Sequence, residues 1–207
     1  MSEPIRILTV DDHPLFLEGI AALISGQPDM KLVAEASNGR EAVALTREYR
    51  PDIVLMDLQM SGMNGLDATM SICAEFRDTK IIVLTTYSGD VQVLRALKAG
   101  ARAYLLKNLV AKELLDTIRA VHAGKRTLSP EVSYQLAEHA TDDALTPGEI
   151  AVLRGIAAGN ANKAIAADLS ISEESVKGRV RSILSKLGAK DRTDAAIIGI
   201  RRGIIEL

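Results

Sequence analysis

The stretch IVLMDLQM, residues 53 to 60, decides the fold of the first half of this chain. Its four consecutive apolar residues, Ile53 to Met56, are typical of a strand that is buried on both faces of a parallel sheet. A single carboxylate, Asp57, stands at the end of this run. Because burying an unpaired charge is costly, such a carboxylate must be hydrogen-bonded, paired, bound to a metal or reactive. The rest of the chain determines which of these applies.

Length and composition are those of a globular protein with an aliphatic core. At roughly 100–200 residues per domain, 207 residues allow one large domain or two modest ones. Hydrophobic residues make up 47% of the chain and aromatic residues only 3%, so aliphatic side chains must fill the core. The single cysteine, Cys73, excludes an intramolecular disulfide.

No export or membrane signal is found in the sequence. The N-terminal residues MSEPIRILTV lack the order of charge, apolar stretch and cleavage site that marks a signal peptide. No segment approaches the roughly 18 consecutive apolar residues of a membrane-spanning helix. We therefore expect a cytoplasmic protein with no membrane partner.

The first half alternates between strand-like and helix-like segments. Five apolar runs predict strands: IRILTV (5–10), LVAEA (32–36), DIVLMD (52–57), KIIVLTT (80–86) and AYLLK (103–107). Each is followed by an amphipathic stretch of helix length. Strands that alternate with helices in this way predict a doubly wound, five-stranded parallel sheet with helices on both faces.

Polar residues stand at the ends of these strands, where the ligands of doubly wound sheets bind. They are Asp11 and Asp12, Asp57, Thr85 and Lys107. Two carboxylates about 4 Å apart repel by about 4 kcal/mol at an effective dielectric constant of 20. Lys107 and a divalent cation would relieve that repulsion. Ligands that are all oxygen atoms favour Mg²⁺.

The second half is helical. The segment 123–142 predicts a linker that contains one short helix, between a first domain at 1–122 and a second at 143–207. The residues LTPGE predict the start of a helix, with Thr146 as the N-cap, Pro147 in the first position and Glu149 completing a capping box. Glycines at 159, 188 and 203 then divide the sequence into four short helices.

Charge differs mildly between the halves. Residues 1–122 carry 13 basic and 16 acidic residues, whereas residues 143–207 carry 10 basic and 8 acidic residues. A net charge of +2 permits nucleic-acid binding by the second half but does not demand it.

The chain resembles a two-component response regulator of the NarL/LuxR type. The first half looks like a receiver domain, on the evidence of Asp11-Asp12, Asp57, Thr85 and the run KAGARAYLLK that ends in Lys107. The second half is similar to the LuxR-type helix-turn-helix domain, on the evidence of the runs LTPGEIAVL, NKAIAADL and SVKGRVRSILSKLGAKDRTDA. The resemblance covers nearly the whole chain except the linker.

From this resemblance, Asp57 is expected to accept a phosphoryl group from a sensor histidine kinase. Mg²⁺ is expected to bind Asp12, Asp57 and the backbone of Gln59, with Asp11 assisting through water. The function expected is that of a DNA-binding transcription regulator, with a homodimer formed on phosphorylation or on double-stranded DNA.

Three further positions receive roles from the resemblance. Lys107 is expected to contact the phosphoryl oxygens, Thr85 to turn toward the phosphate, and Tyr104 to move with it as a switch. Without the resemblance, Tyr104 is more simply interpreted as a packing residue, and Lys107 as a surface lysine.

The recognition helix expected from the resemblance has one apolar face, formed by Val176, Val180, Ile183, Leu184 and Leu187. The opposite face is predicted to have a centre of small residues between two basic edges, a shape that fits the major groove. The candidate DNA-binding residues are Lys177, Gly178, Arg179, Arg181, Ser182 and Lys186.

Two other functions remain open on the sequence alone. One is a Mg²⁺-dependent phosphohydrolase that uses Asp57 as its nucleophile, although the short loops after the strands leave little room for a substrate lid. The other is a regulator that binds DNA without phosphorylation, against which the complete acidic cluster argues.

Overall fold

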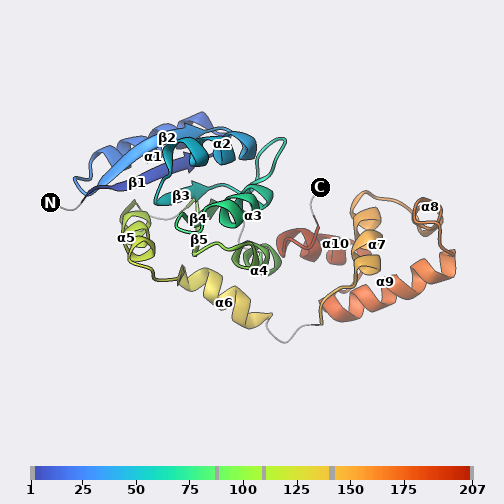
Figure 1. Cartoon of the computed structure of the whole chain (residues 1–207). Helices are drawn as coiled ribbons and strands as arrows, with labels where there is room; N and C mark the ends of the chain where they lie inside the picture. The colour runs from blue at the N-terminus through green and yellow to red at the C-terminus, as the bar shows by residue number, and fades with distance from the viewer. Residues whose placement is uncertain (1–2, 87–88, 109–110, 140–142, 206–207) are drawn as a thin grey trace. The chain divides into compact units, whose positions relative to one another are not determined.

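The computed structural model describes residues 3–86, 89–108, 111–139 and 143–205, which belong to two compact units (Figure 1). The first unit contains Met1–Thr86 and Val93–Ser133, and most of the second is Tyr134–Leu207. The boundary before Tyr134 falls within the stretch 123–142, and the short segment Tyr87–Gln92 is also grouped with the second unit.

The first unit is a parallel sheet whose strands alternate with helices. The strands are β1 (Ile5–Val10), β2 (Met30–Ala36), β3 (Ile53–Met56), β4 (Lys80–Thr85), β5 (Ala103–Leu106) and β6 (Thr127–Leu128). The helices between them are α1 (Pro14–Ser25), α2 (Gly39–Tyr49), α3 (Gly65–Glu75), α4 (Asp90–Ala99) and α5 (Ala111–His122). The strand order is β2-β1-β3-β4-β5-β6, and every pair is parallel. The predicted doubly wound fold is confirmed.

The sixth strand corrects the prediction of five. Thr127 and Leu128 pair with Ala103 and Tyr104 of β5, and the Thr127 N–H donates to the Arg102 carbonyl at 3.0 Å. A strand of two residues is too short to produce an alternating pattern, so the sequence gives no sign of it. As a result, the beginning of the predicted linker is part of the sheet.

The core of this unit is aliphatic, as the composition predicted. Ile7, Leu55, Ile82 and Leu105 lie on four adjacent strands and pack against buried residues of α1 and α5 (Ile20, Ile24, Leu114, Leu115, Ile118 and Val121). Ile53 to Met56 are all buried, which confirms that β3 is covered on both faces. A rigid strand therefore lies directly before Asp57.

The second unit is a small helical domain. After α6 (Pro130–Glu138) come α7 (Pro147–Ala157), α8 (Asn162–Asp168), α9 (Glu173–Leu187) and α10 (Arg192–Arg201). One apolar cluster joins the last four of these helices, with Leu153, Ile165, Val176, Ile183 and Ala195 among its fully buried members. The four predicted helices are confirmed.

Helix starts in this unit differ in how they are capped. Thr146 and Glu149 form the predicted capping box on α7, and Ser172 accepts a hydrogen bond from the Ser175 N–H at the start of α9. Ala161 occupies the N-cap position of α8 and offers no side-chain acceptor. Helix α8 thus begins without a side-chain cap.

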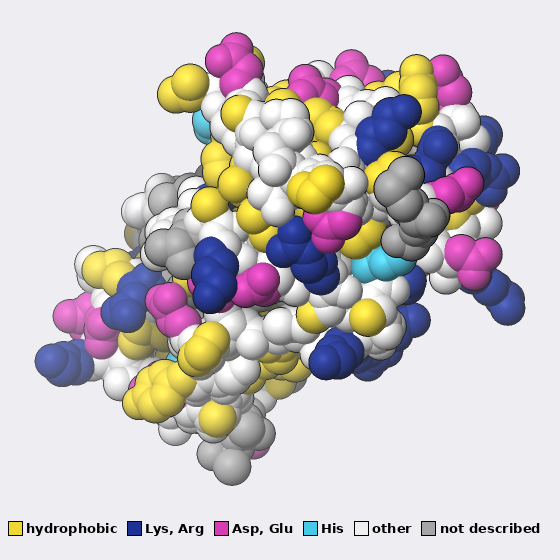
Figure 2. All heavy atoms as spheres, turned by 90° about the vertical axis from the view of Figure 1, so that its left-hand side faces the viewer, with side chains coloured by type: hydrophobic (Ala, Val, Ile, Leu, Met, Phe, Trp, Pro, Cys, Tyr) yellow, Lys and Arg dark blue, Asp and Glu magenta, His cyan; other side chains and the backbone are white. Residues whose placement is uncertain are grey.

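Basic and acidic side chains are interspersed on the face of the molecule in Figure 2, in keeping with the net charge of −2. Within the ranges that the structure describes, no helix combines the length and the apolar composition needed to cross a bilayer.

Candidate functional site

The candidate site of the first unit lies at the C-terminal ends of the parallel strands. Asp11, Asp57 and Lys107 each follow directly after a strand. Their backbone N–H groups donate to carbonyls of the neighbouring strand ends, at 3.0 Å from Asp11 to Ala36, 3.0 Å from Asp57 to Val10 and 2.8 Å from Lys107 to Thr85. The sheet itself therefore fixes where these three side chains begin.

The Lys107 ammonium joins two of the carboxylates. Its Nζ lies 2.6 Å from Asp11 Oδ2 and 2.8 Å from Asp57 Oδ2. Both carboxylates are almost fully buried, with side-chain exposures of 2% and 3%. The Phe16 ring also lies near the ammonium, with 4.8 Å between Nζ and the ring centroid, which is within the range of a cation–π contact.

Burial and charge act in opposite directions on these groups. Burial raises the pKa of Asp57, and the hydrogen bond from Lys107 offsets only part of that effect. Burial alone would lower the pKa of Lys107, but its hydrogen bonds with Asp11 and Asp57 outweigh burial and raise that pKa. The ammonium is therefore held in its charged form beside Asp57.

Four side chains could hold a metal ion. Asp11, Asp12, His13 and Asp57 each offer one ligand atom, and these atoms all lie within 4.8 Å of one another. The backbone N–H of Gln59 donates to the Asp57 carboxylate, so Gln59 also lies beside the cluster. Three carboxylates in this space fit a hard divalent cation such as Mg²⁺, which prefers oxygen ligands.

The two predicted switch residues are buried close to this cluster. Thr85 is fully buried, and its hydroxyl makes no hydrogen bond to any residue that the structure describes. Tyr104 is also fully buried, and its pKa is raised, first by burial and then by the charge of Asp57. Tyr104 thus packs in the core, as its sequence alone suggested, and also lies close enough to Asp57 to experience its charge.

Sequence reasoning missed two residues of this site. The backbone of Gly65 passes so close to Asp57 that a Cβ atom would lie 1.8 Å from the Asp57 carbonyl oxygen. The Asn64-Gly65 pair marks a helix start, since Asn64 caps α3, but that pattern does not reveal the close approach. Phe16, beside Lys107, lies in an amphipathic helix where an aromatic side chain signals only packing.

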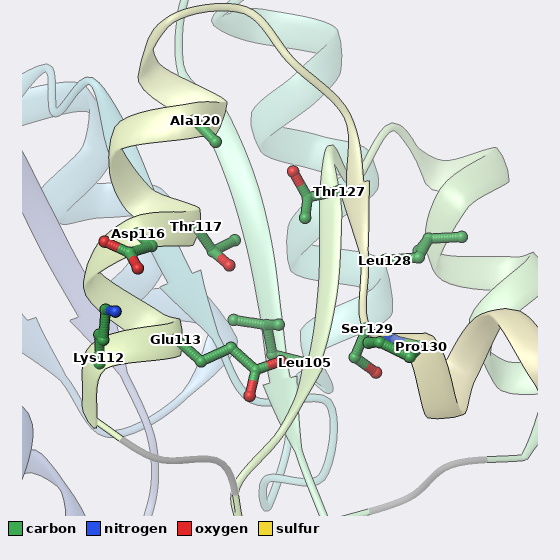
Figure 3. A pocket seen from close by; sticks show the side chains of 10 residues that line it. All are labelled: Leu105, Lys112, Glu113, Asp116, Thr117, Ala120, Thr127, Leu128, Ser129 and Pro130. Atoms are coloured by element: carbon green, nitrogen blue, oxygen red, sulfur yellow. The ribbon is translucent and has the colours of Figure 1, made fainter.

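An open groove of about 440 Å³ lies elsewhere in this unit, between α5 and the β6 segment (Figure 3). Its walls include Glu113 and Thr117 from α5 and Thr127 and Leu128 from β6. None of its ten lining residues belongs to the acidic cluster. The groove is therefore separate from the candidate site.

In the second unit, the candidate recognition helix is α9. Lys177 and Arg181 are exposed, with side-chain exposures of 47% and 76%, and they form long ion pairs with Glu173 and Glu174 at 3.5 to 3.8 Å. Exposed pairs of this kind contribute little to stability, so both cations can readily exchange partners. Gly178 lies beside them, and a Cβ at that position would meet nothing within 4 Å.

The predicted second basic edge of α9, formed by Arg179 and Lys186, packs on α7 together with Ser182 from the predicted centre of small residues, which corrects the prediction of two free basic edges. Ser182 Oγ donates to Glu149 Oε1 at 2.5 Å, and Lys186 Nζ lies 2.9 Å from Glu149 Oε2. The Arg179 guanidinium donates to the Gly148 carbonyl at 3.3 Å. Helical spacing predicts which face of α9 a residue lies on but cannot show that α7 packs against part of that face.

Glu149 is the centre of this contact. It is buried, and burial would raise its pKa, but hydrogen bonds from Ser182, Lys186 and Thr146 together lower that pKa to about 2. Glu149 is thus a charged side chain that joins the N-terminus of α7 to one edge of α9.

Comparison with known proteins assigns both halves of the chain. Residues 7–119 match the response regulator receiver domain, and residues 143–198 match the luxR family of bacterial regulatory proteins. The chain is 42% identical to the transcriptional regulatory protein LiaR of Bacillus subtilis, over 97% of this chain and 99% of that protein.

Solved structures give the same result. The crystal structure of the response regulator ChrA, from a heme-sensing two-component system, has a TM-score of 0.59 and 35% identity over 99% of this chain and 100% of that one. A complex of the response regulator RcsB with DNA has a TM-score of 0.74 over 96% of this chain and 99% of that one. Its 23% identity makes this second likeness one of fold alone.

Proposed function

Because this chain belongs to the response regulators that join a receiver domain to a LuxR-type DNA-binding domain, we propose that phosphorylation of Asp57 controls its binding to DNA. The observation that carries this proposal is the position of Asp57, which is buried at a strand end and paired with Lys107 at 2.8 Å. The phosphoryl donor is a sensor histidine kinase, and the protein acts in the cytoplasm.

The chemistry proposed is in-line transfer of a phosphoryl group to an Asp57 oxygen. The bond between phosphorus and the kinase histidine breaks as the bond from phosphorus to the Asp57 carboxylate forms. Asp57 is suited to this step because β3 fixes its backbone. A fixed orientation reduces the entropy that is lost on reaching the transition state. The 2.8 Å contact between Lys107 Nζ and Asp57 Oδ2 supports a role for Lys107 in contacting the phosphoryl oxygens and balancing their charge.

Asp11, Asp12, Asp57 and the backbone of Gln59 are the residues that would hold Mg²⁺. The bound ion would neutralise charge on the transferring phosphoryl group. Asp12 is suited to a direct ligand role because its side chain is 30% exposed, whereas Asp11 is already paired with Lys107. This difference supports the expectation that Asp11 assists through water.

The buried Thr85 hydroxyl supplies a route from the phosphate to the rest of the protein. A buried hydroxyl without a partner costs free energy, so a phosphoryl oxygen within reach would be an attractive acceptor. Thr85 pairs with Leu106 of β5, two residues after Tyr104. We infer that movement of Thr85 toward the phosphate is transmitted through β5 to Tyr104.

For DNA recognition, we infer that Lys177 and Arg181 contact the major groove from the free edge of α9. Gly178 leaves open space beside them, which allows a close approach of DNA. Arg179, Ser182 and Lys186 then act mainly by fixing α9 on α7. One helix-turn-helix makes few contacts, so the DNA-bound form proposed is a homodimer on two half-sites about 10 base pairs apart.

The decisive experiment combines mass spectrometry with a DNA titration. A small phosphodonor and Mg²⁺ should add one phosphoryl group to the protein and strengthen its binding to DNA fragments selected from a random pool. Asp57→Asn, or removal of Mg²⁺, should abolish both effects. The same adduct on the Asn variant would refute the assignment of Asp57.

The same reaction separates a regulator from an enzyme. A regulator should hold its phosphoryl group and release phosphate slowly, since a single transfer is its task. Continuous release of phosphate at many turnovers per second would instead support a phosphohydrolase. DNA binding that is equally strong without the phosphodonor would support a regulator that does not depend on phosphorylation.

A further inference from the structure

His13 is the one member of the four-residue cluster to which the proposed function gives no role. Its Nδ1 atom lies 3.0 Å from Asp11 Oδ1 and 2.9 Å from Asp12 Oδ1, although the side chain is 72% exposed. An exposed imidazole can adopt many orientations. Its contact with both carboxylates at once therefore indicates that they hold this side chain in place.

The backbone helps to fix this placement. The His13 N–H donates to Asp11 Oδ1 at 3.0 Å, and Pro14 follows at the start of α1. His13 is the N-cap residue of α1, yet its side chain makes no capping hydrogen bond. The imidazole therefore faces the carboxylates instead of closing the helix.

The cluster has two distinct sides. Lys107 contacts the Oδ2 atoms of Asp11 and Asp57, whereas His13 contacts the Oδ1 atoms of Asp11 and Asp12. On the His13 side, the 2.9 Å between Nδ1 of His13 and Oδ1 of Asp12 matches the spacing of two ligands around one cation, and Asp11 Oδ1 lies close enough to assist through water. Two ligands at a right angle, each about 2.1 Å from a metal ion, lie about 3.0 Å apart.

We propose that Nδ1 of His13 directly binds a divalent transition-metal ion, such as Mn²⁺, at the acidic cluster. A nitrogen ligand adds little for Mg²⁺, which prefers oxygen, but imidazole is a common ligand of transition metals. His13 thus broadens the range of cations that the site binds and favours transition metals over Mg²⁺. This inference rests on the cation site of the proposed function.

The first test measures nitrogen coordination without changing the sequence. Mn²⁺ is added to the full-length protein at pH 8, because metals bind the neutral form of imidazole. Pulsed electron paramagnetic resonance should detect coupling between Mn²⁺ and a directly bound nitrogen. Protein labelled with ¹⁵N only at histidine should replace the ¹⁴N signal with a ¹⁵N signal. Absence of any nitrogen coupling in a Mn²⁺-loaded sample would overturn the inference.

The second test compares affinities. His13→Ala should weaken Mn²⁺ binding at least about tenfold, since loss of even an outer-shell partner costs 10–100-fold. It should change Mg²⁺ binding less than about twofold, and it should abolish the nitrogen coupling. His122→Ala is the matched control, because His122 lies at the end of α5 outside the metal-ligand group, and it should leave both affinities unchanged. Equal losses of Mg²⁺ and Mn²⁺ binding in His13→Ala would contradict a nitrogen-specific role.

The outcomes distinguish this inference from the function on which it rests. If Mg²⁺ binds and supports phosphorylation of Asp57 but Mn²⁺ shows no bound nitrogen, only the role of His13 is wrong. If neither cation binds, or if Asp12→Asn binds both as tightly as the natural sequence does, the proposed cation site fails as well.

Discussion

The backbone of Gly65 packs directly on the backbone of Asp57. The Gly65 N–H donates to the Leu58 carbonyl at 3.1 Å, and a Cβ atom on Gly65 would lie 1.8 Å from the Asp57 carbonyl oxygen. No side chain fits at that distance without a shift of the backbone. The start of α3 and the loop after β3 can therefore meet only because residue 65 is glycine.

Gly65→Ala should both destabilise the first unit and slow phosphorylation. Overpacking of this kind typically costs about 1–3 kcal/mol, and here the displaced backbone carries Asp57. Urea denaturation and the rate of acylphosphate formation from a small phosphodonor measure the two effects. Gly19→Ala is the control, because a Cβ there meets nothing within 4 Å. In a helix interior it should stabilise the protein by about 0.5–1 kcal/mol. A Gly65→Ala protein that is phosphorylated at the normal rate would show that the Asp57 backbone tolerates the shift.

Thr85→Ala should allow phosphorylation but prevent the gain in DNA affinity and dimerisation that is proposed to follow it. The variant keeps Asp57, Lys107 and the carboxylates, so it should still accept the phosphoryl group. It lacks the hydroxyl that is proposed to turn toward the phosphate, so it should gain little DNA affinity or dimer on phosphorylation. Analytical ultracentrifugation and DNA titration, with and without phosphodonor, measure this response. Thr85→Ser, which retains the hydroxyl, should respond normally. A full response by the Ala variant would exclude this coupling route.

Lys177 and Lys186 should differ in what their removal costs, although both are lysines on α9. Lys177→Ala or Arg181→Ala should weaken specific DNA binding by about 1–3 kcal/mol if a base contact is lost, with little change in stability. Lys186→Ala should instead lower the stability of the second unit, because it leaves buried Glu149 with one hydrogen bond fewer. Thermal unfolding and DNA titration of the three variants provide the comparison. Full DNA binding by a Lys177→Ala, Arg181→Ala double variant would exclude this edge as the DNA-contacting surface.

Glu149 should make the second unit sensitive to acid. Its pKa in the folded protein is about 2, below the ordinary value of 4.5, so the folded state favours the charged carboxylate. The resulting stability is fully present above about pH 5 and is lost as the pH falls toward 2. Glu149→Gln should therefore be much less stable than the natural protein at pH 7, and the difference should shrink by pH 3.

Hydrogen exchange of peptides from α7 and α9 measures this effect locally. The exposed Glu174 provides the control, since Glu174→Gln should change exchange little at either pH. A gap between the Glu149→Gln variant and the natural protein that stays constant from pH 7 to pH 3 would mean that shape, and not charge, is what Glu149 provides.

Ala161→Ser should stabilise the second unit by about 1 kcal/mol. Ala161 already has the extended backbone of an N-cap residue, with φ −72° and ψ 156°, so a serine hydroxyl at this position could accept a hydrogen bond from the start of α8. Ala167→Ser, on an exposed position within the same helix, should instead destabilise slightly, because serine is a weaker helix former. Urea denaturation of both variants checks the sign of each effect.

The sequence predicted those features that depend on position along the chain. Asp11, Asp57 and Lys107 were placed together because parallel strands bring their C-terminal ends to one edge of a sheet, and each residue follows an apolar run. The capping box of Thr146 and Glu149 was predicted for a similar reason, since its two members are three residues apart.

Features that depend on which surfaces meet could not be predicted. The spacing of Thr146 and Glu149 along the chain predicts the contact between these two residues. It cannot predict the contacts of Glu149 with Ser182 and Lys186, which are more than thirty residues away. In the sequence, Gly65 cannot be distinguished from any other glycine at the start of a helix. Its close approach to the Asp57 backbone is apparent only in the folded chain. Strand β6 forms because β5 offers it an open edge, and its own two residues carry no periodic pattern.

If α9 contacts DNA as proposed, the contact between α7 and α9 also limits which positions of this helix can change the DNA sequence that the protein binds. Positions 179, 182 and 186 face α7, so a substitution there changes both the stability of the domain and the orientation of the helix. This contact does not involve Lys177, Gly178 or Arg181. Under the proposed mode of recognition, a designer who wishes to redirect the protein to a new DNA sequence should randomise these three positions first and leave Glu149 and its partners intact.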